Sequence, residues 1–173
     1  MLKVSLKWGV ASGAIMTVLL LISFFFFPEN DPAYFSSAEN YGYASMVASL
    51  AVIYLALNDK SLRTDTVVLT MWQRILIGCG VSLVAGLIFG FYNLIYTSYM
   101  NPEFMDVYYD YYISQLPVQS GPEFERMVAE LEAQKSMFMA PVTQFSVMAA
   151  TVVMIGIPMS IVLAFIHKLR AKA

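Results

Sequence analysis

The chain has 173 residues, of which 59% are hydrophobic and only 13% are charged. Soluble domains carry about 25% charged residues, and a chain with so few could not cover its apolar surface in water. This composition excludes a soluble globular fold and predicts an integral membrane protein with a single membrane domain over residues 1–173. The formal net charge of −2 argues against nucleic acid as a partner, because proteins that bind nucleic acid present basic surfaces.

Four long runs of the sequence carry no charged side chain. They extend from Trp8 to Phe27, Tyr41 to Leu57, Ile75 to Pro102 and Ser136 to Ile166. A helix needs roughly 20 apolar residues to cross the hydrocarbon core of a bilayer, and in hydrocarbon the backbone must satisfy its own hydrogen bonds. The runs therefore predict an all-α membrane protein with four transmembrane helices, at about residues 5–27, 41–58, 73–100 and 141–167.

The distribution of charge predicts which ends of these helices face the cytoplasm. Eight of the ten basic residues lie before the first helix, between the second and third, or after the fourth; ten of the twelve acidic residues lie in segments 28–40 and 103–135. Segments rich in Lys and Arg stay in the cytoplasm. We expect both termini inside, the acidic segments outside, and a multi-pass protein of the cell inner (cytoplasmic) membrane. Arg74, at the inner edge of the third helix, is expected to extend towards the headgroups.

Residues 101–140 form the only sizeable segment expected outside the bilayer. Apolar and aromatic residues recur at near-helical spacing from Phe104 to Leu116, and Pro117 then disfavours helix at the residue before it. Ser120 is expected to cap a second helix. We interpret the segment as an extracytoplasmic amphipathic hairpin that caps the bundle, lies in the headgroup layer or docks a partner protein, and capping is favoured. For docking, the partner face would consist of Phe124, Met127 and Leu131.

Small residues recur at every fourth position of two predicted transmembrane helices. The third helix carries Gly78, Ser82, Gly86 and Gly90, and the fourth carries Gly156 and Ser160. Such spacing lets two helix backbones approach closely in a membrane. The pattern predicts helix packing, either within the bundle, which is favoured, or along the seam of a homo-oligomer.

The polar residues inside the membrane runs are all uncharged. Asn93 and Gln144 are the best candidates, because both lie near the outer side, where they could bond across helices or line a polar pocket under the hairpin. No run contains a pair of carboxylate, His or Cys side chains, so we expect no enzymatic activity, no metal site in the membrane and no cofactor. An acidic helix face outside the membrane could hold a divalent cation, although such faces are more often merely solvated. This face consists of Glu103, Asp106 and Asp110.

Two stretches of sequence carry a resemblance to a known family. Gly42-Tyr43-Ala44-Ser45-Met46 leads into the second apolar helix, and Asn101-Pro102-Glu103-Phe104-Met105-Asp106 follows a third helix with a Tyr-rich end. Together with the acidic insert and the basic C-terminal tail, they make nearly the whole chain resemble the domain of unknown function 4199 family. The resemblance implies a small four-helix membrane protein of a kind found mostly in Bacteroidota. That family has no established activity, so the resemblance transfers no functional residue.

Three hypotheses for function remain open at this point. The first is a non-enzymatic accessory or scaffold protein, or a small-ligand-binding component, acting through its periplasmic hairpin. The second is an oligomeric small transporter or channel. The third is an intramembrane enzyme, for which no reactive groups are visible. The expected partners are the lipid bilayer and either further copies of the chain or another membrane protein.

Overall fold

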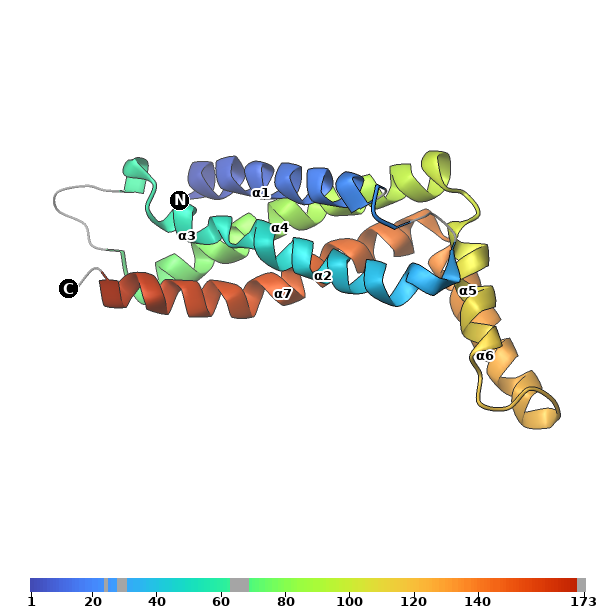
Figure 1. Ribbon diagram of the computed structural model, residues 1–173. Helices are drawn as coiled ribbons and strands as arrows, with labels where there is room; N and C mark the ends of the chain where they lie inside the picture. Colours follow the sequence, from blue (N-terminus) through green and yellow to red (C-terminus); the bar gives the residue numbers. More distant parts are fainter. Residues whose placement is uncertain (24, 28–30, 63–68, 171–173) are drawn as a thin grey trace.

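The computed structural model describes residues 1–23, 25–27, 31–62 and 69–170, and these residues contain no strand. Helices α1 (Leu2–Ser23), α2 (Phe35–Leu50), α3 (Val52–Leu57), α4 (Met71–Ile95) and α7 (Pro141–Arg170) run side by side in a bundle (Figure 1). Helices α5 (Phe104–Ser114) and α6 (Pro122–Phe138) form a hairpin at one end of it. Two short 3-10 helices, η1 (Pro32–Tyr34) and η2 (Lys60–Leu62), and a π-helical segment, η3 (Tyr96–Met100), complete the described elements. We name the end where α1 begins and α7 ends the terminal end, and the other the hairpin end.

Four helical segments are long and apolar enough to cross a membrane: Leu2–Ser23, Phe35–Leu57, Met71–Met100 and Pro141–Arg170. The predicted all-α fold with four long apolar helices is therefore confirmed. The second segment consists of α2 and α3, which are separated by Ala51, whose backbone keeps the helical conformation. Which end of the bundle faces the cytoplasm stays a prediction. Glu29, Arg63 and Lys172, which contributed to that prediction, lie outside the described residues.

Several helix ends differ from the predicted ones, and local interactions explain them. α1 ends at Ser23 rather than near Phe27, and the Phe27 amide donates to the Ser23 carbonyl in a turn. α4 begins at Met71 because Thr70 and Gln73 form a reciprocal capping box, with distances of 2.9 and 3.2 Å. The predicted cap of the hairpin's second helix was wrong. The residue before α6 is Gly121, whose positive φ of 93° suits glycine, and no side chain caps this helix.

Helix α4 lies at the centre of the bundle. Its contacts with α7 and with α1 are more extensive than those between any other two helices. The core mixes apolar side chains with serines. Its largest fully buried side chains are Met16, Leu50, Ile53, Ile77, Val81, Val152, Ser12, Ser49, Ser82 and Ser160. Some serines also join helices, since the Ser12 hydroxyl donates to the Ser49 carbonyl at 2.9 Å and the Ser5 hydroxyl to the Ile77 carbonyl at 3.2 Å. Small polar residues thus fill space that larger apolar ones could not.

The small residues of α4 face α7 in an antiparallel seam. A Cβ added to Gly78 would overlap Ser160, and one added to Gly156 would overlap Ser82, so each serine sits on a glycine of the other helix. Further along, a Cβ on Gly86 would lie 2.7 Å from the Ala149 carbonyl oxygen, and one on Gly90 would lie 2.8 Å from the Phe145 ring. In this structure the stripe serves packing within the chain, while self-association stays a prediction.

Arg74 does not extend to the surface as expected. It is only 5% exposed, and its Nε has no hydrogen-bond partner in the described part of the chain. The reason is its position four residues before Gly78, which places it on the face of α4 that packs on α7. The capping box that starts α4 at Met71 fixes Arg74 in the first helical turn, on that inward face.

Candidate functional site

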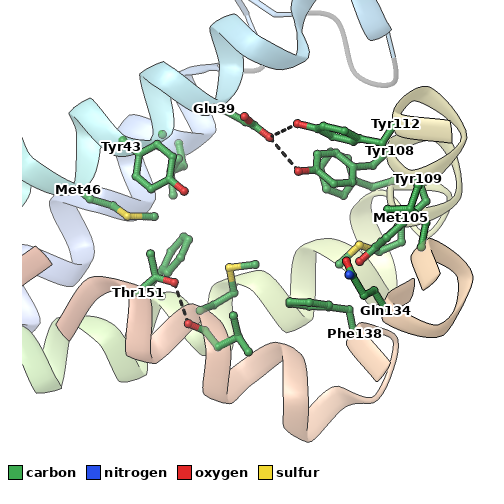
Figure 2. Close-up of a pocket in the computed structure, with 17 residues that line it drawn as sticks. Glu39, Tyr43, Met46, Met105, Tyr108, Tyr109, Tyr112, Gln134, Phe138 and Thr151 are labelled. Carbon is green, nitrogen blue, oxygen red and sulfur yellow. Dashed lines mark hydrogen bonds between the residues drawn. The ribbon is translucent and has the colours of Figure 1, made fainter. Parts of the chain in front are cut away.

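A cavity of about 580 Å³ opens between the hairpin and the adjacent end of the bundle. We call it the hairpin cavity. It is lined by α1, α2, α4, α5, α6 and α7, so it draws on all four long apolar segments and on both hairpin helices (Figure 2). Its volume lies within the range of about 300 to 1,000 Å³ that is usual for small-molecule sites. The walls are mostly aromatic rings, methionines and aliphatic side chains.

Helix α5 supplies the aromatic wall of the cavity. Tyr108 and Tyr112 lie one helical turn apart, with ring centroids separated by 4.7 Å, and Tyr109 beside them is only 7% exposed. The ring contacts continue into α2, where buried Phe35 meets the rings of Tyr108 and Tyr111, with centroid distances of 5.8 and 5.3 Å. These contacts attach α5 to the start of α2 and set the position of the wall.

Glu39 of α2 is the polar centre of this region. Its Oε1 accepts hydrogen bonds from the Tyr108 hydroxyl at 2.9 Å and from the Tyr112 hydroxyl at 3.2 Å (Figure 2). Burial raises the pKa of Tyr108, and its hydrogen bonds with Tyr112 and Glu39 raise it further. The phenol therefore stays a proton donor throughout the physiological range. Among the described residues that line the cavity, Glu39 is the only acidic side chain and none is basic.

An ion pair fixes α6 against α5. Lys135 Nζ lies 2.6 Å from Asp106 Oδ1, and this hydrogen bond raises the pKa of Lys135. The contact positions the inner face of α6, from which Leu131, Gln134 and Phe138 line the cavity. The hairpin thus closes one side of the cavity.

The residues predicted to form a polar pocket are not part of the cavity lining. Gln144 is buried, and its Oε1 accepts a hydrogen bond from Thr97 Oγ1 at 2.9 Å, which joins α7 to η3. The same hydroxyl lies 3.0 Å from the Asn93 carbonyl. Asn93 itself is half-buried, and its amide nitrogen has no partner in the described part of the chain. Gln144 thus takes the other predicted role, bonding between segments.

The predicted partner face on α6 and the predicted acidic face on α5 contribute little to the hairpin cavity. Phe124, Met127 and Leu131 are all half-buried on α6, and of the three only Leu131 lines the cavity. The acidic face of α5 does not converge on a cation site. Asp106 is paired with Lys135, and the described residues contain no group of three or more His, Cys, Asp or Glu side chains that could hold a metal ion.

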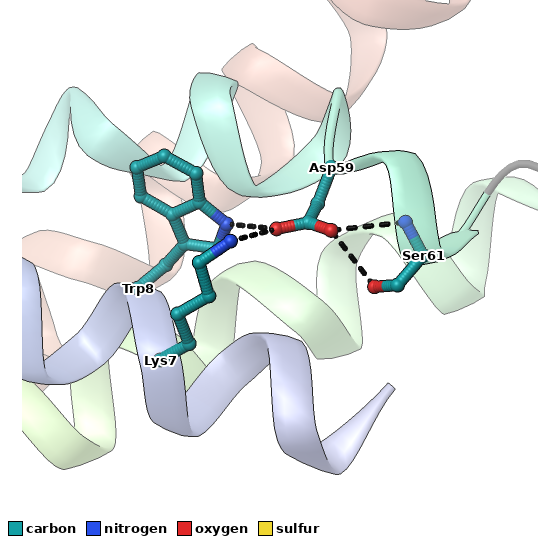
Figure 3. Close-up of polar contacts among 4 residues, drawn as sticks. All are labelled: Lys7, Trp8, Asp59 and Ser61. Atoms are coloured by element: carbon teal, nitrogen blue, oxygen red, sulfur yellow. Dashed lines mark hydrogen bonds and ion pairs between the residues drawn. The ribbon is translucent and has the colours of Figure 1, made fainter.

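A second polar cluster lies at the terminal end, and the sequence reasoning missed it. Asp59, just after α3, accepts from Lys7 Nζ at 2.8 Å and from Trp8 Nε1 at 2.7 Å with one oxygen, and from the amide and hydroxyl of Ser61 with the other (Figure 3). The hydrogen bond from Lys7 lowers the pKa of Asp59 most, with contributions from Ser61 and Trp8. This cluster ties α1 to the turn after α3. The available signal in the sequence was that Lys7 and Asp59 carry opposite charges and lie just outside the first and second apolar runs.

Comparison with known proteins identifies the family of the chain. A family model described as Protein of unknown function (DUF4199) matches residues 7–168, which is nearly the whole chain. No curated protein and no solved structure is significantly similar to the chain. The resemblance drawn from the second helix and the Asn101–Asp106 stretch is thereby confirmed, and the chain belongs to the DUF4199 family of proteins of unknown function.

Proposed function

We propose that this multi-pass membrane protein is a non-enzymatic binding component that holds a small amphiphilic ligand in the hairpin cavity. The cavity itself is the observation that carries the proposal. It has the volume of a ligand site, and the part of the chain with the most distinctive composition, the aromatic and acidic hairpin, forms one of its walls.

The position of the cavity supports an amphiphile in particular. One side is made by the hairpin ends of apolar helices, through residues such as Leu20, Phe89 and Met148, and the other by the polar hairpin. This arrangement supports a position of the cavity at the level where hydrocarbon meets headgroups, a region in which tyrosine rings are also favoured. A molecule with an apolar part and a polar part would match both sides. If the basic termini are cytoplasmic, the cavity opens on the periplasmic side.

The chemistry of the lining favours binding over catalysis. It offers phenols, a carboxylate, the Gln134 amide and the Thr151 hydroxyl, and this hydroxyl already donates to its own helix at the Val147 carbonyl at 2.9 Å. Two phenols, Tyr108 and Tyr112, do meet the Glu39 carboxylate, but the pKa of Tyr108 is raised well above its ordinary value, which opposes its activation as a nucleophile. An oligomeric transporter or channel remains the alternative, but the α4 stripe that would suit an oligomer seam is covered by α7.

Filling the cavity is the direct test. A Cβ at Gly42 of α2 would meet no atom within 4 Å, so Gly42→Leu should occupy cavity space without disturbing the fold. Ala44→Leu is the matched control, because Ala44 lies two residues away on the same helix, is exposed and does not line the cavity.

The measurement is native mass spectrometry of the protein released from gently extracted membranes. We expect the wild type and Ala44→Leu to carry a bound small molecule and Gly42→Leu to have lost most of it. Equal occupancy in all three proteins, or no bound molecule in the wild type after delipidation and readdition of a total lipid extract, would overturn the proposal.

A further inference from the structure

The described side chains that line the hairpin cavity carry charge of only one sign. Its lining contains the carboxylate of Glu39 and no Lys, Arg or His side chain among the described residues. Lys135, the basic residue of the hairpin near this wall, is paired with Asp106 and so adds no free positive charge. The described residues around this end of the bundle, 31–40 and 103–135, hold nine acidic side chains and only two basic ones. Charge of one sign around a concave site concentrates ligands of the opposite sign.

Aromatic rings add to this preference. Tyr43, Tyr108, Tyr109 and Tyr112 all line the cavity, and Figure 2 shows Glu39 with the tyrosines of α5 on one side of it and Tyr43 across the opening. The face of an aromatic ring attracts a cation, and cages of several rings recognise quaternary ammonium groups. A carboxylate among tyrosine rings is therefore a site suited to an ammonium group.

The hydrogen bonds of Glu39 leave it able to act on a ligand. Both tyrosine hydroxyls donate to Oε1, which holds the carboxylate in place, and the described residues provide no donor to Oε2. Glu39 is also exposed at the opening rather than sealed inside. The carboxylate is thus fixed in position by the protein while one oxygen remains available.

The opposite part of the cavity is apolar. Met46, Phe89 and Met148 lie on the bundle side, and Met46 and Phe89 are only 6% and 7% exposed. Methionines adapt to the shape of a neighbouring chain, so this side suits an alkyl tail. The polar and apolar parts belong to one continuous cavity, so a single ligand could contact both.

We propose that the ligand of the hairpin cavity is a cationic amphiphile, a lipid or lipid-like amine whose ammonium group lies between Glu39 and the tyrosine rings and whose alkyl chain lies on the methionine side. This inference rests on the proposed function, since it assigns the ligand class of the same cavity.

The test uses three photoreactive probes that share a C12 diazirine chain and differ only in the head: trimethylammonium, neutral hydroxyl and phosphate. Each is titrated into the purified protein in maltoside micelles, and the cross-linked peptides are mapped. We expect labelling of cavity-lining peptides from α2 and α5, with a half-saturating concentration about tenfold lower for the trimethylammonium probe than for the neutral one. The phosphate probe should be weaker still.

Paired variants separate charge from shape. Glu39→Gln should remove most of the preference for the cation and leave the neutral probe unchanged, whereas Glu125→Gln, on an exposed hairpin residue outside the lining, should behave as the wild type. Tyr43→Leu should weaken the cationic probe and Tyr43→Phe should not, because only phenylalanine keeps the ring face. Tyr43 is 54% exposed, so both variants should fold.

The outcomes distinguish the two proposals. Saturable cavity labelling with equal affinity for all heads, or a preference that survives in Glu39→Gln, overturns the cationic ligand and leaves a binding cavity. Labelling that never saturates, or that maps only to lipid-facing residues, overturns the cavity as a ligand site altogether.

Discussion

The contact between α4 and α7 can be tested with a single methyl group. In Gly86→Ala the added Cβ would lie 2.7 Å from the Ala149 carbonyl oxygen, whereas ordinary contact begins at 3.4 Å. The obstacle is backbone, so no side-chain rotation relieves it, and the two helices must separate locally by about 0.7 Å. Gly42→Ala makes the same chemical change in α2, where nothing lies within 4 Å.

The magnitude follows from the packing that this separation removes. A gap of about 0.5 to 1 Å forfeits a quarter to a half of the attraction between atom pairs that are each worth about 0.1 to 0.2 kcal/mol. If about 30 pairs lose about a third of it, the loss is about 1.5 kcal/mol, within the usual range of about 1 to 3 kcal/mol for overpacking. Replacing a helical glycine by alanine gains about 0.4 to 1 kcal/mol in either variant, so this gain cancels in the comparison.

The assay is reversible unfolding in maltoside micelles with increasing dodecyl sulfate, followed by far-ultraviolet circular dichroism. We expect Gly86→Ala to be less stable than Gly42→Ala by about 1.5 to 2 kcal/mol, and Gly42→Ala to equal or exceed the wild type. Stabilities of the two variants within about 0.5 kcal/mol of each other would refute the close approach of α4 and α7.

Three further predictions concern the two ends of the bundle. The pKa of Asp59 is held below its ordinary value of 3.8, so its contribution to stability is complete above that pH and is lost as the pH falls below it; Asp59→Asn should lower the melting temperature at pH 7, and the difference from wild type should shrink in acid. Lys135→Met should accelerate amide exchange in α6 but not in α4, with recovery when Asp106 is also replaced by Leu, and unchanged α6 exchange would argue against the ion pair. In a cysteine-free background, Glu125→Cys should react with a membrane-impermeant maleimide on intact cells and Lys60→Cys should not; the reverse pattern would invert the topology.

The sequence predicts the helices well because the membrane leaves few alternatives. Charge-free runs of sufficient length must be helical, and the four-residue spacing of Gly78, Ser82, Gly86 and Gly90 marks a packing face. The spacing does not tell which helix covers that face, because lipid, α7 or a second copy would all accept it. Arg74 shows the same limit, since it lies four residues before Gly78 and shares the face that α7 covers, and the sequence alone does not identify that covering helix.

The hairpin cavity was beyond the reach of sequence reasoning for a different reason. Glu39 and Tyr43 lie on α2, whereas Tyr108 and Tyr112 lie on α5, about 70 residues later in the chain. Their meeting depends on how the hairpin folds back, and no local periodicity encodes that angle. Individually, Tyr43 reads as one of the rings that prefer a membrane interface, and Glu39 as one acid in an acidic loop.

The order of the helices along the chain determines when the seam between α4 and α7 can form during synthesis. α7 follows every other apolar helix, so α1 and α4 can pair in the membrane while the residues that complete α4's most extensive contact are still being synthesised. Until then α7 does not cover the glycine stripe of α4, and the hairpin lacks the helix that follows it. The nascent protein should be most open to intramembrane quality-control proteases during that interval.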